Sequence, residues 1–174
     1  MTLNILFSDC YQPITLAAVT TVQFAVAHPE NRVILCQHPK LLDSLVQCVQ
    51  SRHSAIQRAG AAAMPPLSFE PAVQDWLARH DGFVDSVLGL MRSSDQELIH
   101  FGCSTLWNLS SCEVNRDRLV KKPGVLDTMT RVLCYRPPPS QSPVLDFTDC
   151  LQAVLSALCN LASPGMHYIY YIDY

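Results

Sequence analysis

Charged residues are scarce in this sequence, and no basic surface is evident. Asp, Glu, Lys and Arg make up 16% of the 174 residues, and the formal net charge is −3. Nucleic-acid binding usually depends on a strong positive field, which the lone pair Lys121-Lys122 at a solvated helix end cannot supply. We therefore expect no nucleic-acid partner. The apolar content of 49% is enough for a buried core, which excludes a wholly disordered chain.

Long apolar runs are also missing. No stretch is long enough to cross a bilayer, so we expect no membrane span. The first nine residues are apolar, but they lack a basic start, and Asp9 ends the run too early for a signal peptide.

The sequence contains no CxxC motif and no clustered Cys/His framework. Most of its eight cysteines sit among Leu, Val and Ala at helical spacing, where a free thiol acts as a small apolar side chain. We interpret them as reduced core residues of a protein in the cytosol or nucleus. They are Cys10, Cys36, Cys48, Cys103, Cys112, Cys134, Cys150 and Cys159.

Motifs of catalysis and cofactor binding are absent as well. There is no glycine-rich phosphate loop, no GxSxG elbow and no HExxH. Cys36-x-His38 offers at most half of a zinc site, and Cys112 has no evident histidine base. We expect no metal, no cofactor and no enzyme activity.

An internal repeat is the strongest positive signal. With a shift of 42 in the numbering and no gaps, residues 40–81 laid on 82–123 match at eight positions. This shift is one repeat period, and two periods bring Asn31-Arg32 onto Asn115-Arg116. The chain therefore divides into units at about 3–39, 40–81, 82–123 and 124–163. The matched pairs are Asp43/Asp85, Ser44/Ser86, Ser51/Ser93, Gly60/Gly102, Leu67/Leu109, Ser68/Ser110, Asp75/Asp117 and Leu77/Leu119.

Each unit has the periodicity of helices. Apolar residues recur at intervals of three and four, as one buried stripe requires. Ser94 and Glu97 form a predicted capping box before a longer helix that ends near Ser111. A short helix is expected after Asn115-Arg116, and Gly82 and Gly124 supply left-handed turns. The stripes are Leu42, Leu45, Val46 and Val49; Val84, Val87, Leu88 and Met91; and Ile99, Gly102, Cys103, Leu106 and Leu109.

Prolines interrupt this regular pattern twice. Met64-Pro65-Pro66 stands inside the long helix of the second unit, and proline there predicts a kink or loop after about Ala63. In the last unit, Leu158-x-Asn160-Leu161 follows Leu106-x-Asn108-Leu109 by 52 residues and not by 42, so ten residues are inserted. An insertion near 136–143 is therefore expected to form an exposed loop between a helix that ends near Cys134 and one that starts near Asp146.

Three helices of short, medium and long length in each repeat unit, with glycine between the first two, resemble the armadillo repeat. The specific residues are Leu106-x-Asn108-Leu109-Ser110, Leu158-x-Asn160-Leu161-Ala162, the two Asn-Arg pairs, Gly82 and Gly124. The resemblance implies an all-α fold, a right-handed α-solenoid of about three and a half repeats over residues 1–163. The Tyr-rich residues 164–174 fit no repeat position.

The resemblance also implies a partner-binding groove lined by the third helices. In armadillo proteins an Asn near the end of that helix often holds the backbone of an extended peptide, and Asn108 and Asn160 occupy this position. His100, Ser104 and Asn108 share one helix face by their spacing of four. The alternative is an Asn that only caps or tethers neighbouring segments.

The sequence departs from armadillo readers of basic nuclear signals. The tryptophan that precedes the Asn by four positions in those proteins is replaced here by Ser104 and Ser156, and the Asn itself by Phe24 and Pro66 in the first two units. Recognition of nuclear signals is therefore not implied.

The expected function is a scaffold that binds a protein or peptide, with further contacts possible through the exposed solenoid ends. Asn108→Ala should then weaken binding and leave folding nearly intact, and Leu109→Ala should do the reverse. Two alternatives stay open. The chain could be an incomplete, truncated or alternatively spliced piece of a larger armadillo protein, or, with less support, a helical enzyme or metalloprotein.

Overall fold

The computed structural model describes residues 12–135 and 147–163, and this part of the chain contains ten helices and no strand. The all-α class is therefore confirmed for the described residues. In chain order the helices are α1 (Gln12–Ala27), α2 (Pro29–Cys36), α3 (Pro39–Val49), α4 (Ser54–Phe69), α5 (Pro71–Arg79), α6 (Phe83–Met91), α7 (Gln96–Ser111), α8 (Glu113–Lys121), α9 (Val125–Cys134) and α10 (Thr148–Ala162).

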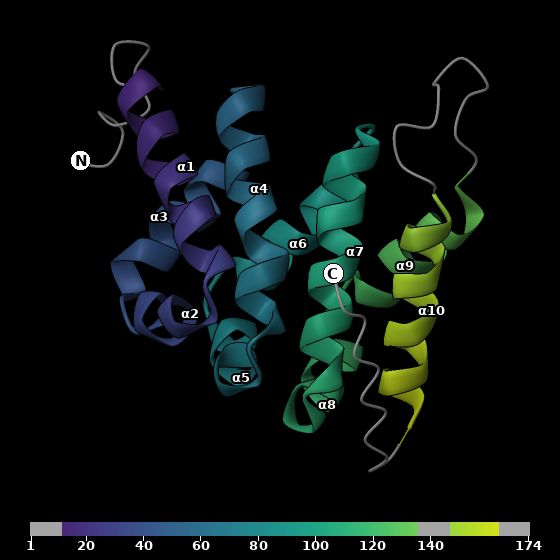
Figure 1. Ribbon diagram of the computed structural model, residues 1–174. Coiled ribbons are helices and arrows are strands. Elements are labelled where there is room, and N and C mark those ends of the chain that lie inside the picture. The colour runs from purple at the N-terminus through teal and green to yellow at the C-terminus, as the bar shows by residue number, and fades with distance from the viewer. Residues whose placement is uncertain (1–11, 136–146, 164–174) are drawn as a thin grey trace.

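Helices that hold the same position in successive repeat units lie beside one another. The long helices α1, α4, α7 and α10 form one row, in which each packs against the next, and α3, α6 and α9 form a second row behind them (Figure 1). The helices α2, α5 and α8 contact one another in the same order. After α1, the described chain thus consists of three successive three-helix units, α2–α4, α5–α7 and α8–α10.

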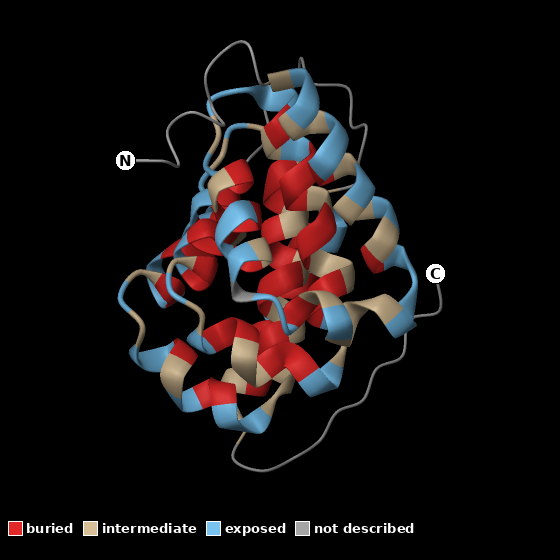
Figure 2. Cartoon of the chain, turned by 90° about the vertical axis from the view of Figure 1, so that its left-hand side faces the viewer, coloured by how far each residue is buried: buried red, intermediate tan, exposed pale blue. Residues whose placement is uncertain are grey.

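The predicted apolar stripes form the core. Every residue of the three stripes is buried, and Leu42, Val87, Cys103, Leu106 and Leu109 have no exposed surface. Figure 2 shows the buried parts of the helices gathered toward the inside of the stack, with exposed parts mostly at its outside. One continuous core therefore runs through successive units instead of a separate core in each.

Glycines set two features of the helix packing. Gly82 and Gly124 adopt φ of 78° and 86° just before α6 and α9, so the predicted left-handed turns are confirmed. Gly102 lets α6 approach α7 closely. A Cβ there would lie 3.0 Å from both the backbone nitrogen of Met91 and the carbonyl oxygen of Val87.

The predicted break in the second long helix is wrong. Helix α4 runs from Ser54 to Phe69 through both Pro65 and Pro66. An interior proline costs about 3 kcal/mol because it removes a backbone hydrogen bond and crowds the carbonyl one turn earlier. The helix buries eight residues, including Met64 and Leu67 on either side of the prolines. Burial of one large apolar side chain contributes about 1.5–3 kcal/mol, so packing outweighs the local cost.

Two predicted helix starts also need correction. The N-cap of α7 is Asp95, whose carboxylate accepts from the Glu97 N–H at 3.0 Å, so the capping box does not involve Ser94. Either residue is a suitable cap by sequence, and the chain uses the later one. Helix α8 begins at Glu113, so Asn115-Arg116 lies within this helix and not before it.

The last unit agrees with its predicted register where the structure describes it. Helix α9 ends at Cys134 as expected, and α10 begins at Thr148, two residues later than expected. The predicted loop at 136–143 and the Tyr-rich residues 164–174 lie outside the described residues.

The cysteine prediction holds for the buried positions. The seven cysteines in the described ranges are free thiols, and Cys36, Cys48, Cys103 and Cys150 are buried. Burial raises the pKa of the Cys36 thiol to about 12, which keeps it protonated and unreactive. Cys134 and Cys159 are exposed instead and are not core residues.

Candidate functional site

Three of the four predicted site residues lie together on α7. His100, Ser104 and Asn108 are all half-buried, whereas their chain neighbours Ile99 and Cys103 are buried. The spacing of four thus brings these side chains to one accessible face, as the sequence predicted.

Asn108 is held by the preceding long helix. Its side-chain amide donates to the backbone carbonyl of Pro65 at 3.0 Å and to the hydroxyl of Ser68 at 3.1 Å. These bonds join α7 to α4, its counterpart in the preceding unit. Asn108 therefore has the tethering role that was the alternative to a groove contact, while its amide oxygen can still accept a hydrogen bond.

Asn160 repeats this contact one unit later, in a more buried position. Its side-chain amide donates to the hydroxyl of Ser110 at 3.0 Å, and only 7% of the residue is exposed. Ser110 stands one repeat period after Ser68, so the two Asn–Ser pairs are equivalent. The expectation that Asn160 lines an open groove is not met, because the packing of α10 on α7 encloses its side chain.

His100 contacts α10. A hydrogen bond to Cys150 raises the pKa of His100, with a smaller contribution from Asp149, and partial burial opposes the shift. Cys150 also forms a hydrogen bond with the thiol of Cys103. This bond raises the pKa of Cys103. The hydrogen bonds with Cys103 and His100 lower the pKa of Cys150. These polar contacts join α7 to α10 beneath the predicted face.

The Asn-Arg pairs cap the long helices. Asn31 donates to the carbonyl of Ala25 at 3.0 Å, and Arg32 donates to that of Val26 at 2.9 Å. The last carbonyls of a helix have no partner within it, so these side chains satisfy the C-terminal end of α1.

The same capping recurs on α7. Asn115 and Arg116 donate to the carbonyls of Leu109 and Ser110 at 3.2 and 3.3 Å. Gln74, one repeat period before Arg116, caps α4 in the same way. Its side-chain amide donates to the carbonyl of Ser68 at 3.0 Å. The residues that carry the family resemblance therefore have structural roles that repeat with the chain.

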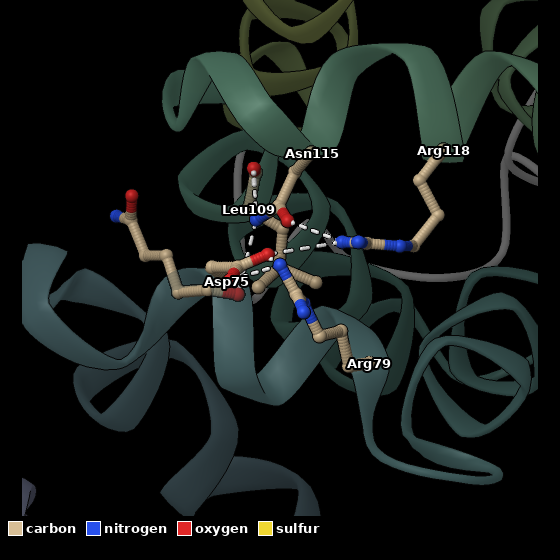
Figure 3. Close-up of polar contacts among 6 residues, drawn as sticks. Asp75, Arg79, Leu109, Asn115 and Arg118 are labelled. Atoms are coloured by element: carbon tan, nitrogen blue, oxygen red, sulfur yellow. Dashed lines mark hydrogen bonds and ion pairs between the residues drawn. The ribbon is translucent and has the colours of Figure 1, made fainter.

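Figure 3 shows how this capping extends into an ionic network around Asp75 on α5. The carboxylate accepts from Arg79 at 2.9 Å and from Arg118 of α8 at 3.2 Å, and Arg118 also donates to the Asn115 amide oxygen at 2.9 Å. The hydrogen bond from Arg79 is the main reason that the pKa of Asp75 is lowered, with Arg118 adding to it. The network joins two successive first helices of the repeat.

The second helices carry a further set of ties that the sequence analysis missed. Gln50 donates to the Ser86 hydroxyl at 3.1 Å, and Arg92 donates to the Thr128 hydroxyl at 2.9 Å. Each donor and each acceptor stands one repeat period from its counterpart. The sequence did contain a signal for these contacts, namely polar residues that recur every 42 positions. Ser44 and Ser86 are one such pair in the repeat alignment.

Contacts between a carboxylate and a basic side chain recur with the same period. Asp43 and His80 lie 3.1 Å apart, and Asp85 and Lys122, one repeat later, lie 2.9 Å apart. His80, Asp85 and Lys122 line a pocket of about 300 Å³ between α5, α6 and α8. Arg79, Arg118 and Lys122 at this pocket each have a carboxylate partner, so its lining has little unbalanced charge for an anion.

No protein-family model matches the chain, and no curated protein matches it either. Within the described residues, no helix is long and apolar enough to cross a membrane, and no group of three or more His, Cys, Asp or Glu side chains is placed to hold a metal ion.

Proposed function

We propose that this protein is an armadillo-type, right-handed solenoid that binds a segment of a protein partner on the face formed by α1, α4, α7 and α10. Three observations support the proposal: the internal sequence repeat, the packing of each helix on its counterpart in the next unit, and the left-handed glycines before α6 and α9. A stack of repeats buries its core between units and leaves one long face for a ligand.

The side chains on this face suit an extended segment with apolar groups. Phe24 is 69% exposed on α1, and its equivalents one and two repeat periods later are the half-buried Pro66 on α4 and Asn108 on α7. Arg58 on α4 is paired with both Asp95 and Glu97, so its positive charge is neutralised and this cluster keeps one net negative charge. The face therefore changes from apolar at α1 to polar at α7, where Ser104 and the Asn108 amide oxygen are placed to contact a peptide backbone.

The free thiols support a reducing compartment, so we place this activity in the cytosol or nucleus. The proposed partner is a protein or peptide, and the proposed role is binding without catalysis.

The test is a selection of peptides from a displayed library on the wild-type protein, followed by titration against variants. Ser104→Arg places a long charged side chain on the proposed face, and we expect it to abolish binding of the selected peptides. Thr130→Arg is the matched control, because Thr130 is an exposed hydroxyl residue on α9, away from this face. Phe24→Ala should also weaken binding without loss of stability.

Melting curves must first show that the three variants fold like the wild type. Peptides that bind Ser104→Arg and Phe24→Ala as tightly as they bind the wild type would refute the proposed face.

A further inference from the structure

Two cysteines from neighbouring long helices meet in the core between the last two units. Cys103 on α7 has no exposed surface, Cys150 on α10 is 2% exposed, and the two thiols form a hydrogen bond. Cys36 and Cys48 are also buried, but there burial alone raises the thiol pKa. They provide an internal comparison for the pair on α7 and α10.

The repeat register shows that this contact is a regular position of the stack. Cys103 stands one period of 42 after Ala61 on α4, and Cys150 stands 52 residues after Leu98 on α7, because ten residues are inserted between them. Ala61 and Leu98 are buried as well. The junction of α4 with α7 therefore has an apolar pair where the junction of α7 with α10 has two thiols. Packing alone does not require sulfur at this position.

The basic neighbour of the thiol pair follows the same register. His100 forms a hydrogen bond with Cys150, and Asp149 interacts with His100 electrostatically. One junction earlier, Arg58 holds the position of His100 and pairs with Glu97, the counterpart of Asp149. Both junctions thus place a basic side chain beside an acidic one. An imidazole differs from a guanidinium because it can take up and release a proton near neutral pH.

These contacts give the two sulfurs different chemistry. Hydrogen bonds with Cys103 and His100 lower the pKa of Cys150, whereas the bond with Cys150 raises the pKa of Cys103. The thiolate is the nucleophilic form of cysteine, so Cys150 is the more reactive of the two. Its partner His100 is half-buried, so Cys150 adjoins a side chain that reaches solvent, and Cys103 lies deeper.

We propose that Cys103 and Cys150 are a redox-sensitive pair, which a hydroperoxide such as hydrogen peroxide converts into a disulfide between α7 and α10. The Cys150 thiolate attacks one peroxide oxygen, and the O–O bond breaks. The leaving hydroxide takes a proton from protonated His100 and departs as water, which leaves a sulfenic acid on Cys150.

Cys103 completes the reaction. Its sulfur attacks the sulfur of the sulfenic acid, the S–O bond breaks, and the leaving hydroxide departs as water with the proton of the Cys103 thiol. In total, two thiols are oxidised to one disulfide, and one hydrogen peroxide is reduced to two waters. A dithiol reductant reverses the change by thiol–disulfide exchange.

A reversible bond of this kind suits a reducing compartment, where disulfides are mostly transient and sense oxidants. It joins the last long helix covalently to the preceding unit. Because the bond also restricts the unfolded chain, the oxidised protein should be the more stable form. This inference does not depend on the partner-binding face.

The first experiment maps the disulfide in the full chain after treatment with hydrogen peroxide. Cys112, Cys134 and Cys159 are first replaced by serine, because they are not buried and would share tryptic peptides with the pair. Mass spectrometry should then find one cross-link, between the peptides of Cys103 and Cys150, which dithiothreitol removes. Cys36 and Cys48 should still be free for alkylation after unfolding.

Three results of this mapping would overturn the proposal. Cys103 and Cys150 could stay free, they could be oxidised no faster than Cys36 and Cys48, or either could be joined to a different cysteine.

The second experiment separates the two sulfurs in the same background. Cys103→Ala removes the second thiol and introduces the residue found at the equivalent position of α4, so the fold should tolerate it. We expect dimedone, a reagent selective for sulfenic acid, to label Cys150 in this variant. In Cys150→Ala, Cys103 should remain a free thiol. Labelling of Cys103 in Cys150→Ala, without labelling of Cys150 in Cys103→Ala, would contradict the proposed order of steps.

His100→Gln tests the contribution of the imidazole. Disulfide formation should slow roughly tenfold, because a neutral amide favours the thiolate less than a protonated imidazole does. The ultraviolet absorbance of the thiolate, followed across pH, should shift to higher pH in the same variant. His28→Gln is the matched control, since His28 also has an acidic neighbour, Glu30, but lies at the other end of the stack. Equal rates and equal absorbance profiles in the two variants would overturn the role of His100.

Thermal melts complete the test. The peroxide-treated background protein should melt several degrees above its reduced form, and Cys103→Ala should show no such rise. A disulfide that forms only after urea has unfolded the protein would show that the folded chain does not bring the two sulfurs into reach, and would overturn the proposal.

Discussion

The side-chain amide of Asn108 on α7 donates to the backbone carbonyl of Pro65 on α4 at 3.0 Å. Proline lacks an N–H, so α4 has lost backbone bonds near this point, and Asn108 adds a bond from a neighbouring helix. The sequence favoured a partner contact for this residue, with a tether between neighbouring segments as the alternative. Its observed contacts make it part of the junction between two units.

Asn108→Ala should therefore destabilise the fold, contrary to the expectation from sequence that folding would be nearly intact. The change removes two hydrogen bonds and leaves the Ser68 hydroxyl without this donor, so we expect a loss of about 1–2 kcal/mol. Ser104→Ala on the same face is the control and should stay within about 0.5 kcal/mol of the wild type. Urea unfolding of the three proteins provides the measurement, and equal midpoints would show that the junction contributes nothing.

Substitution of either of two glycines by alanine should change the stability of the fold, in opposite directions for the two positions. At Gly102 the new Cβ would lie 2.7 Å from Met91 Cγ and 3.0 Å from backbone atoms of α6, so the helices must move apart and stability should fall. At Gly89, which is exposed, a Cβ meets nothing within 4 Å. There alanine should stabilise α6 by up to about 1 kcal/mol through its higher helix propensity. Thermal melts decide the signs, and a stabilised Gly102→Ala variant would contradict the close packing.

The helices and their buried sides could be predicted because they depend on local spacing. The Val84, Val87, Leu88 and Met91 stripe follows directly from the pitch of the α-helix, and the left-handed turn at Gly124 follows from the absence of a Cβ. These features need no knowledge of distant residues, and the internal repeat showed them more than once.

The two main errors depended on contacts between units. Proline at position 66 has a local cost that sequence makes visible, but the burial of Met64 and Leu67 that offsets it comes from neighbouring helices. In the same way, the side-chain chemistry of Asn160 suits a peptide or a Ser hydroxyl equally well. Only the packing of α10 on α7 decides between an open face and the buried contact with Ser110.

Replacement of Pro66 by alanine should stabilise the protein. The helical backbone at this position is already formed, and alanine restores an N–H to the carbonyl of Ala62. The greater freedom of the unfolded chain opposes this gain of about 3 kcal/mol by about 0.4–1 kcal/mol, so a net increase of about 2 kcal/mol remains. Urea unfolding should show a higher midpoint with an unchanged slope. A lower midpoint would mean that the proline ring makes packing contacts worth more than the restored bond.

Replacement of two leucines by alanine should destabilise the protein to different extents, because one leucine lies in the core and the other on the surface. Leu109 is fully buried on α7, and Leu109→Ala should cost about 2–5 kcal/mol. Leu155 on α10 is 53% exposed, so Leu155→Ala should cost much less. Denaturant titration gives both values. Similar losses for the two variants would show that the outer side of α10 is covered in solution.

The Asp75 network should make stability depend on pH in the acid range. Arg79 and Arg118 lower the pKa of this carboxyl below its ordinary value of 3.8. A folded pKa below the unfolded one means that the contribution is present above pH 3.8 and is lost as pH falls through the folded pKa.

Melting temperatures measured from about neutral pH down to about pH 2 should therefore show Asp75→Asn below the wild type near neutrality, with the gap closing under acid. The difference should be modest and should shrink in high salt, because 38% of the Asp75 side chain is exposed to screening solvent. Asp117→Asn is the control, since Asp117 is 78% exposed and pairs only with Lys121 on its own helix among the described contacts. A gap between wild type and Asp75→Asn that stays constant across the acid range would contradict the role of the carboxylate charge in joining α5 to α8.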